Sequence, residues 1–459
     1  MASVAVRVGT GGSPTATDAV ITAPIPSGYT PQQFTGNGTV RYAGTAYQVA
    51  ISLGTSTFSF QWPASVTLPS GATVTVDMEL FTDIGFTEQM AWRSFEARKR
   101  ARALRRFWLK LGGRASAPCN IVAVGDSITE GYPPSGVRTN LLTEECWRAL
   151  LVSKLRSAFP TSGAAGTGGY YAALHNNVEP NDYPVTRNGV LSQNASGFGL
   201  RNVFLRAAGN YVEFTCPANT TSVDVIWHRT PSASNFSWQI NGGAATNVTA
   251  SGTDTDGMVT NITGVVAGDK IRVNYVSGAG ALINGFFAYG GDEAKGIRMW
   301  DSGRATVTCS TLVASSTSVW FQNFNVVQPD LVMILIGAND ASKTNGLRTS
   351  AQFAADLQTL ITNIKAQCTV APSIMLMTQW QVSTPVEPWE NYVNVIKAAA
   401  AADDDIMFFD MRNIIWKRPF GSDTAGGMLV DYIHPGREAS EILADGLLNV
   451  IRPGMAHLL

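Results

Sequence analysis

Apolar and polar residues recur in a regular pattern from about residue 116 onward. Continuous apolar runs at 121–124, 331–336, 374–378 and 406–410 are of the kind that a parallel sheet buries on both faces. Apolar residues at helical spacing lie between and after these runs, at about 143–159, 349–364 and 438–450. Strands that alternate with helices of this length predict an α/β domain with a doubly wound parallel sheet.

This pattern is interrupted between residues 196 and 291, where no helical spacing occurs. Eight short strands are predicted there instead, at 203–206, 211–215, 222–228, 236–240, 246–250, 258–262, 270–276 and 283–289. The tripeptide Asn241-Gly242-Gly243 is a strong hairpin signal between two of them. The segment therefore predicts a β-sandwich or jelly roll that is inserted into the α/β domain.

The first part of the chain predicts a small β-module followed by a helix. Strands are predicted at 38–42, 47–53, 56–61 and 72–80, with turns rich in Gly, Pro and Ser between them. The helical stretch that follows is strongly basic up to Lys110. Two interpretations of it remain open. It is either a connector with a solvated basic face, or a helix that uses Leu104, Trp108 and Leu111 to bind a partner or a second copy.

These patterns divide the chain into four parts. Residues 1–82 are predicted to form the N-terminal β-module, and 83–114 the basic connector helix. Residues 115–195 and 292–459 together form the α/β domain, and 196–291 form the inserted sandwich.

The composition is that of a folded, nearly neutral protein. Apolar residues make up 45% of the 459 residues, charged residues make up 15%, and the net charge is -1. No overall field therefore draws the chain to nucleic acid or to anionic lipid. No run reaches the roughly 18 apolar residues of a membrane span, and the N-terminus lacks the pattern of a secretory signal. The five cysteines have no paired spacing, which favours buried free thiols over disulfides or a zinc site.

Two polar residues follow buried runs at the points where the predicted strands end. Ser127, preceded by a glycine and an aspartate, comes directly after the run 121–124. The carboxyl ends of parallel strands form the edge where α/β folds bind ligands, so Ser127 is a candidate nucleophile. Asn339 follows the run 331–336 in the same way, and its neutral amide suits stabilisation of an oxyanion. The alternative for both positions is an ordinary turn.

Asp431 and His434 precede the last predicted helix. A spacing of three residues puts the carboxylate and the imidazole on the same side of one turn. Asp431 can then accept from one ring nitrogen and leave the other as a base for Ser127. Pro435 restricts the backbone of His434 and suits the start of a helix.

Taken in order, these motifs resemble a known family. Gly-Asp-Ser at Ser127, Gly-x-Asn-Asp at 337–340 and Asp-x-x-His at 431–434 resemble the first, third and fifth blocks of the SGNH (GDSL-like) hydrolases. The segment 296–306 resembles the second block, with Gly303 as a backbone donor, although Asp301 stands where the family usually has asparagine. The resemblance covers about residues 116–453. Some family members of actinobacteria and their phages carry a similar inserted β-sandwich.

The resemblance implies a flavodoxin-like doubly wound sheet and a carboxylic ester hydrolase of the EC 3.1.1 class, without a metal or another cofactor. It implies that Ser127, His434 and Asp431 form a catalytic triad. The N–H groups of Ser127 and Gly303, with the side-chain amide of Asn339, are the implied oxyanion hole.

The inserted sandwich, which resembles a carbohydrate-binding module, favours an acetylated polysaccharide as the substrate. A phage tail enzyme that removes acetyl groups from a host surface glycan fits this architecture. We therefore expect an extracellular or virion-associated protein, with a second copy or a virion protein as the candidate partner of residues 1–114. Two alternatives stay open, namely a lipase or thioesterase that acts on longer acyl esters, and a non-catalytic adhesin that binds glycan.

Overall fold

The computed structural model describes residues 2–7, 20–25, 27, 34–53, 55–61, 72–80, 99–131, 144–162, 167–174, 183–192, 196–381, 384–415, 428–431 and 433–453. The chain divides into two compact units, Met1–Arg98 and Lys99–Leu459, and each is described by itself.

The first unit contains a six-stranded antiparallel sheet. Its strands are β1 (Ala2–Arg7), β2 (Val20–Pro24), β3 (Phe34–Tyr42), β4 (Thr45–Leu53), β5 (Thr57–Gln61) and β6 (Thr73–Leu80), in the order β1-β6-β3-β4-β5-β2. Alternate residues of β6, such as Val74 and Val76, are buried in a small core with Val40 and Phe58. The four predicted strands are confirmed. No local hairpin signal predicts β1 and β2, which pair with the distant β6 and β5.

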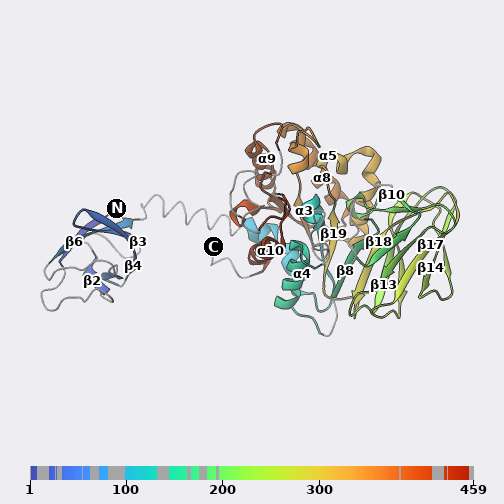
Figure 1. Ribbon diagram of the computed structural model, residues 1–459, viewed down its shortest axis with the longest axis horizontal. Helices are drawn as coiled ribbons and strands as arrows, with labels where there is room; N and C mark the ends of the chain where they lie inside the picture. Colours follow the sequence, from blue (N-terminus) through green and yellow to red (C-terminus); the bar gives the residue numbers. More distant parts are fainter. Residues whose placement is uncertain are drawn as a thin grey trace. The chain divides into compact units, whose positions relative to one another are not determined.

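The second unit contains the predicted parallel sheet (Figure 1). Its strands are β7 (Cys119–Gly125), β19 (Ile297–Gly303), β20 (Leu331–Leu335), β21 (Ser373–Thr378) and β22 (Ile406–Asp410). They lie in the order β19-β7-β20-β21-β22, and every neighbouring pair is parallel. The second strand of the domain is thus at the edge beside the first, which is the flavodoxin-like order. The predicted α/β fold class is confirmed.

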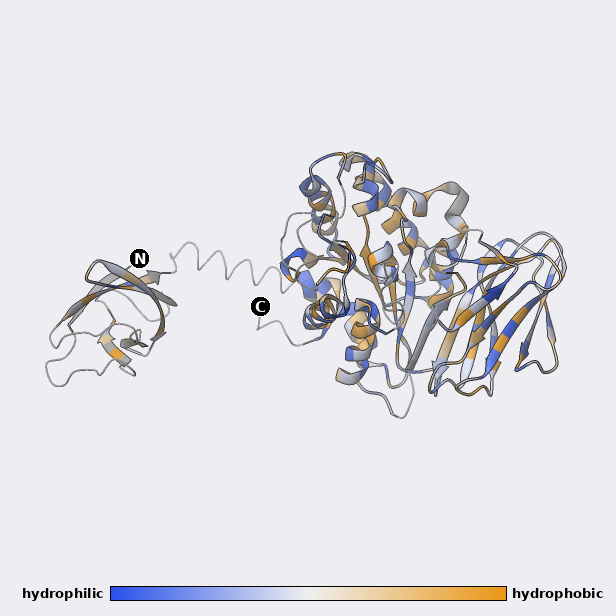
Figure 2. Cartoon of the chain, in the orientation of Figure 1, coloured by the Kyte–Doolittle hydropathy of each residue, from blue (hydrophilic) through white to orange (hydrophobic). Residues whose placement is uncertain are grey.

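Helices cover both faces of this sheet, with α4 and α10 on one side and α8 and α9 on the other (Figure 1). The helices of this unit are α2 (Arg105–Gly112), α3 (Ser127–Glu130), α4 (Trp147–Ala158), α5 (Cys309–Val313), α6 (Gln322–Val327), α7 (Ala338–Ala341), α8 (Ser350–Gln367), α9 (Trp389–Ala401) and α10 (Arg437–Ile451), with the 3-10 turns η3 (Phe198–Leu200), η4 (Ser315–Phe321) and η5 (Met411–Asn413). Apolar residues concentrate on the central strands and on the helix faces that pack on them (Figure 2). The helix predicted from 143 begins at Trp147 instead, and Thr143 lies outside the described residues.

Two antiparallel sheets form the rest of the second unit. Their strands are β8 (Thr167–Ala172), β9 (Val185–Asn188), β10 (Leu191–Ser192), β11 (Val203–Leu205), β12 (Tyr211–Thr215), β13 (Ser222–Arg229), β14 (Ser234–Ile240), β15 (Thr246–Thr249), β16 (Thr255–Thr263), β17 (Lys270–Gly278) and β18 (Ala281–Gly290). One sheet has the order β10-β11-β18-β13-β16 with β8 on β18, and the other has the order β15-β14-β17-β12-β9. Phe214 of the second sheet stacks on Phe286 of the first, so the two sheets share one core.

All eight strands predicted between 196 and 291 are confirmed. The antiparallel region nevertheless begins at Thr167 rather than at 196, because β8, β9 and β10 pair with β18, β12 and β11. The partners of β8 and β9 are separated from them by other strands, and β10 has only two residues, so no short hairpin signal predicts these three strands. We call residues 167–290 the antiparallel region from here on.

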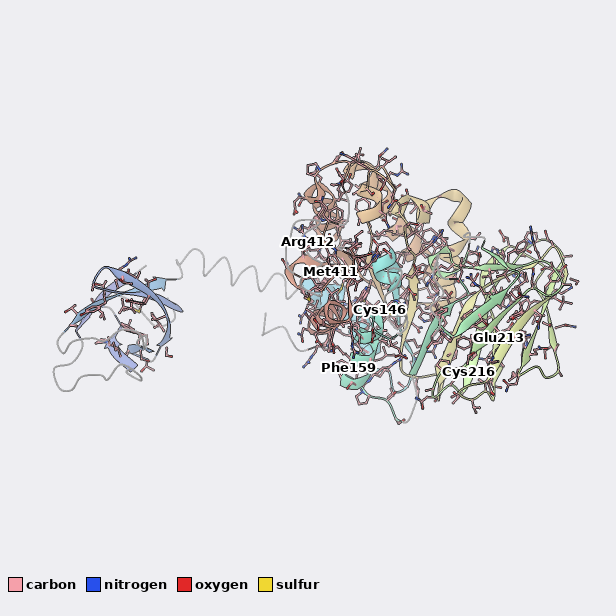
Figure 3. All side chains as sticks on the ribbon, in the orientation of Figure 1. Cys146, Phe159, Glu213, Cys216, Met411 and Arg412 are labelled. Atoms are coloured by element: carbon pink, nitrogen blue, oxygen red, sulfur yellow. The ribbon has the colours of Figure 1, made fainter. Side chains whose placement is uncertain are left out.

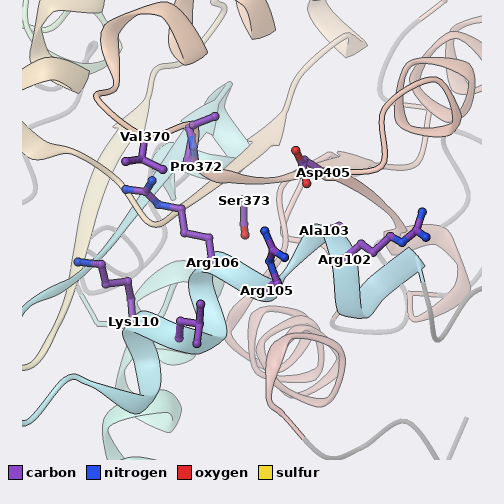
Figure 4. A pocket seen from close by; sticks show the side chains of 11 residues that line it. Arg102, Ala103, Arg105, Arg106, Lys110, Val370, Pro372, Ser373 and Asp405 are labelled. Atoms are coloured by element: carbon purple, nitrogen blue, oxygen red, sulfur yellow. The ribbon is translucent and has the colours of Figure 1, made fainter.

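Residues 83–98 of the predicted connector 83–114 lie outside the described residues, whereas those from Lys99 onward pack with the second unit. Leu104, Phe107 and Leu111 are fully buried in its main core, and the Trp108 indole donates to the Ile451 carbonyl at 2.6 Å. The apolar stripe of this helix thus packs on the α/β domain itself. Its basic side borders an open pocket of about 480 Å³, which is lined by Arg102, Arg105, Arg106 and Lys110 and also by 370–373 and Asp405 (Figure 4).

The five cysteines are free, and four of them are buried, as the sequence predicts. Cys146 precedes α4 and Cys216 lies in the antiparallel region, far apart in the same unit (Figure 3). Among the described residues, no helix combines the length and apolar character needed to cross a membrane. The same residues contain no group of three or more His, Cys, Asp or Glu side chains that could hold a metal ion.

Candidate active site

Ser127 lies at the carboxyl end of β7, as the first residue of helix α3. Asp126 caps this helix, because its carboxylate accepts from the N–H of Ile128 at 3.0 Å. Gly125 allows the close turn, since a Cβ atom there would collide with the Leu335 carbonyl and the Thr129 side chain. The serine is therefore at the point where β7 and β20 end side by side.

His434 and Asp431 form a hydrogen-bonded chain with Ser127. The His434 Nε2 atom is 2.8 Å from the Ser127 Oγ, and its Nδ1 atom is 2.7 Å from Asp431 Oδ2. The other oxygen of Asp431 accepts from the backbone N–H groups of His434 and Ile433, at 2.8 and 3.1 Å. The structure thus brings together the three residues that the sequence predicts to act together.

The surroundings of Asp431 determine which ring nitrogen of His434 carries the proton. Burial raises the pKa of the Asp431 carboxyl, but hydrogen bonds from the His434 ring and backbone outweigh it and hold the pKa below its ordinary value. An ionised carboxylate only accepts, so Nδ1 must be the donor. Nε2 is then left to accept the Ser127 hydroxyl proton. The Trp380 indole donates to the Ile433 carbonyl at 3.1 Å and fixes the turn that carries the ring.

A second carboxylate, that of Asp126, directly precedes the serine, and its surroundings have no signal in the sequence. Asp126 is buried and accepts from the Gln379 amide at 3.1 Å, while the Trp389 indole donates to the Gln379 carbonyl at 3.2 Å. Burial raises the pKa of the Asp126 carboxyl. This contact ties the helix of the serine to the end of β21.

Asn339 lies in the first turn of α7, after the end of β20. Its amide nitrogen donates to the Val307 carbonyl at 3.1 Å, and its oxygen accepts from Asn345 at 3.2 Å. A primary amide has two N–H bonds, so one remains for a ligand while the group is held at both ends. The following residue, Asp340, accepts from the N–H groups of Cys309 and Ser310. Burial raises the pKa of Asp340 to about 6.

Gly303 is the last residue of β19 and lies beside Gly125. It must be glycine, because a Cβ atom would collide with the backbone of Thr129 and Glu130. Its N–H donates to Asp301 Oδ1 at 2.9 Å, however, and so does not point freely at the position of a substrate oxyanion. The Asp301 carboxylate therefore competes with a substrate oxyanion for the N–H of Gly303, which the sequence predicts to be an oxyanion donor.

Asp301 belongs to a buried network of charges that the sequence does not predict. Its carboxylate pairs with Arg201 at 2.8 Å and with Arg148 at 2.9 Å. Arg201 also faces Glu130, the last residue of α3, at 3.5 Å, and the four side chains are almost completely buried. Arg201 comes from the antiparallel region, so this region contributes directly to the support of the serine helix. No spacing rule could reveal the network, because its members are distant in sequence.

The segment 303–307 connects the end of β7, where Ser127 lies, with Asn339. At one end, the N–H of Arg304 donates to the Gly125 carbonyl at 3.0 Å. At the other end, the Val307 carbonyl accepts from Asn339. The antiparallel region reaches the same place, because a Cβ atom on Gly199 would collide with the Gly303 carbonyl.

Comparisons with known proteins agree with this fold and with the resemblance seen in the sequence. The chain is similar to a peptidoglycan O-acetylesterase of known structure, with a TM-score of 0.53 and 15% identity over 79% of this chain and 98% of that chain. Lower scores of 0.27 and 0.23 are found for a family two carbohydrate esterase from Clostridium thermocellum and an acetyl xylan esterase from Butyrivibrio proteoclasticus. These are 11% and 12% identical over 58% and 62% of this chain, and over 98% of each of those chains. No curated protein matches the sequence.

The profile of the GDSL-like lipase/acylhydrolase family matches residues 302–442, which include Gly303, Asn339, Asp431 and His434. Ser127 precedes the matched segment and is joined to it through His434. Residues 302–442 are therefore identified as a domain of the GDSL-like lipase/acylhydrolase (SGNH) family, which supports a carboxylic ester hydrolase.

Proposed function

We propose that this protein is a serine esterase that removes acetyl groups from a polysaccharide by means of Ser127, His434 and Asp431. The observation that carries the proposal is the continuous hydrogen-bond chain from the serine hydroxyl through both imidazole nitrogens to an ionised carboxylate. This arrangement is that of a nucleophile, a general base and a group that orients the base.

In the proposed reaction, the Ser127 oxygen attacks the carbonyl carbon of the acetyl ester while its proton passes to His434 Nε2. Asp431 stabilises the imidazolium that forms. The proton then passes to the sugar oxygen as the ester bond breaks, which leaves an acetyl group on Ser127. A water molecule then gives a proton to His434 while its oxygen attacks the carbonyl carbon of the acyl-enzyme. The bond to the Ser127 oxygen breaks, that oxygen takes the proton back from His434, and acetate leaves.

We propose the Ser127 N–H and the Asn339 amide as the donors to the oxyanion. Ser127 is the first residue of a helix, where a backbone N–H has no partner within the helix. The Asn339 amide is held at both ends and keeps one N–H to offer. Gly303 is the third proposed donor, and it serves only when its N–H leaves Asp301.

Two observations support a polysaccharide ester over a longer acyl ester. The neighbour with the highest of the reported TM-scores is a peptidoglycan O-acetylesterase. In addition, the antiparallel region packs at Gly303, beside the proposed site, where it could bind a polymer close to the serine. The aromatic side chain of Trp227 is buried in the core of that region and is not available for such binding.

The proposal is tested by labelling with a fluorophosphonate and by measuring the acetate released from acetylated glycans. We expect Ser127→Ala to abolish both, whereas Ser153→Ala, a matched change on the exposed side of α4, keeps both. Equal labelling of wild type and Ser127→Ala would reject the nucleophile. Labelling of neither protein would favour the adhesin. A preference for long 4-nitrophenyl acyl esters over acetate would favour the lipase or thioesterase.

The setting of this activity is a further proposal. A host surface glycan as the substrate, an extracellular or virion-associated location, and a homo-oligomer or virion partner of residues 1–114 remain predictions from the sequence. Co-purification of the chain with assembled virions, or its failure to co-purify, would decide between a virion protein and a free enzyme.

A further inference from the structure

Arg304 is a half-buried cation at the edge of the site that forms no ion pair with any residue that the structure describes. Its guanidinium forms no hydrogen bond and no ion pair within the protein as far as the structure describes it, and its Nε atom is inaccessible to solvent. Arginines removed from water are nearly always paired, because the loss of hydration is otherwise uncompensated. Burial accordingly lowers the pKa of Arg304.

The carboxylates near Arg304 are already occupied. Asp301 faces both Arg148 and Arg201, and Glu130 faces Arg201 and also accepts from the Ala305 N–H at 2.5 Å. The Glu130 carboxylate attracts the Arg304 guanidinium and Arg201 repels it, but Arg304 forms no ion pair with either carboxylate.

The backbone places Arg304 beside the proposed catalytic groups. It follows Gly303 directly, and its N–H is bonded to the carbonyl of Gly125, two residues before Ser127. Three residues later, the Val307 carbonyl holds the amide of Asn339. A substrate whose ester carbonyl is attacked by Ser127 would therefore lie next to the segment that carries Arg304.

We propose that Arg304 binds a carboxylate of the substrate, so that the preferred substrate is an acetylated glycan built from acidic sugars. This inference rests on the proposed deacetylase function and specifies its substrate class. A planar guanidinium matches a carboxylate through two parallel hydrogen bonds. The positive charge of Arg304 matches the negative charge of a sugar carboxylate.

The test compares acetate release from O-acetylated polygalacturonate with release from the same polymer after methyl esterification, which removes the charge and keeps the acetyl groups. We expect wild type to prefer the acidic polymer, mainly through a lower KM. Arg304→Gln should lower kcat/KM on the acidic polymer about ten- to a hundredfold more than on the methyl ester, because a hydrogen bond to a charged group is lost. Arg304→Lys, which keeps the charge, should lose less.

Arg206→Gln is the matched control, because it removes the same charge from an exposed position of the antiparallel region. Its ratio of activities on the two polymers should equal that of wild type. An equal loss on both polymers in Arg304→Gln would overturn the inference and leave the deacetylase proposal intact. If wild type released acetate from neither polymer but still hydrolysed 4-nitrophenyl acetate, both the Arg304 inference and the polysaccharide deacetylase proposal would be overturned. Should Arg304→Gln fail to fold, the Arg304→Lys ratio decides in its place.

Discussion

At the scale of single residues, Asp431 is the part of the proposed triad whose surroundings are most completely determined. One oxygen faces the His434 ring and the other accepts from two backbone N–H groups. Because these contacts keep the carboxylate ionised, it can both hold the imidazole in one tautomer and stabilise the imidazolium.

Asp431→Asn tests this role without a large change of shape. The amide can donate to Nδ1, which favours the tautomer that carries its proton on Nε2 and cannot accept from Ser127. We expect kcat for 4-nitrophenyl acetate to fall by about 10³–10⁴-fold, with KM little changed. Asp292→Asn, in an exposed loop of the same unit, should keep wild-type kcat. A loss below tenfold would show that the carboxylate does not act on the imidazole.

At the scale of the elements, the serine helix α3 is held by a strand end and a buried arginine. Arg201 joins Glu130 of the helix to Asp301 of β19, and it comes from the antiparallel region. Burial lowers the pKa of the Arg201 guanidinium, but the two carboxylates outweigh that effect and raise it. These ion pairs thus compensate the loss of hydration of three buried charges, those of Glu130, Arg201 and Asp301.

Arg201→Met should be strongly destabilising, because it leaves two buried carboxylates with less compensation. We expect a loss of about 3–5 kcal/mol in the free energy of unfolding, measured by denaturant titration. Arg206→Met, at an exposed position nearby, should stay within about 0.5 kcal/mol of wild type. The double variant Glu130→Gln with Arg201→Met should recover part of the loss. If the losses of the two single variants simply add, Glu130 and Arg201 do not interact.

The elements also show what the sequence can and cannot reveal. Strands β7, β20, β21 and β22 are predicted, because each is a continuous apolar run between turn signals. The edge strand β19 is not predicted as a strand, since Arg298, Asp301 and Ser302 interrupt its apolar run. Its charged residues are tolerated only because Arg148 and Arg201 come from elsewhere in the chain to pair with Asp301. Such compensation has no local signal.

The same reasoning applies to the candidate site. Ser127, Asn339, Asp431 and His434 are each marked by a strand end or a turn, so the sequence can predict them. The hydrogen bond from Gly303 to Asp301, the Gln379 contact of Asp126 and the unpaired state of Arg304 depend on packing in three dimensions. These are the features that only the structure supplies.

At the scale of the whole molecule, the division into two units makes a prediction about where activity resides. The second unit, Lys99–Leu459, contains its own apolar cores, and every proposed catalytic and oxyanion group lies in it. The first unit has a separate small core around Val40 and Phe58. Each unit therefore has the apolar interior that independent folding requires.

We expect a chain reduced to residues 99–459 to fold and to hydrolyse 4-nitrophenyl acetate with a kcat/KM within about twofold of the full chain, since the reacting groups and their supports all remain. The chain shortened to 115–459 is the informative control. It lacks α2 and the residue before it, so that the fully buried Leu104, Phe107 and Leu111 are lost from the main core, and it should therefore lose stability markedly. Loss of a buried leucine costs about 2–5 kcal/mol, so removal of the helix should abolish the cooperative thermal transition of this unit. An inactive but folded 99–459 chain would instead mean that the first unit contributes to the site.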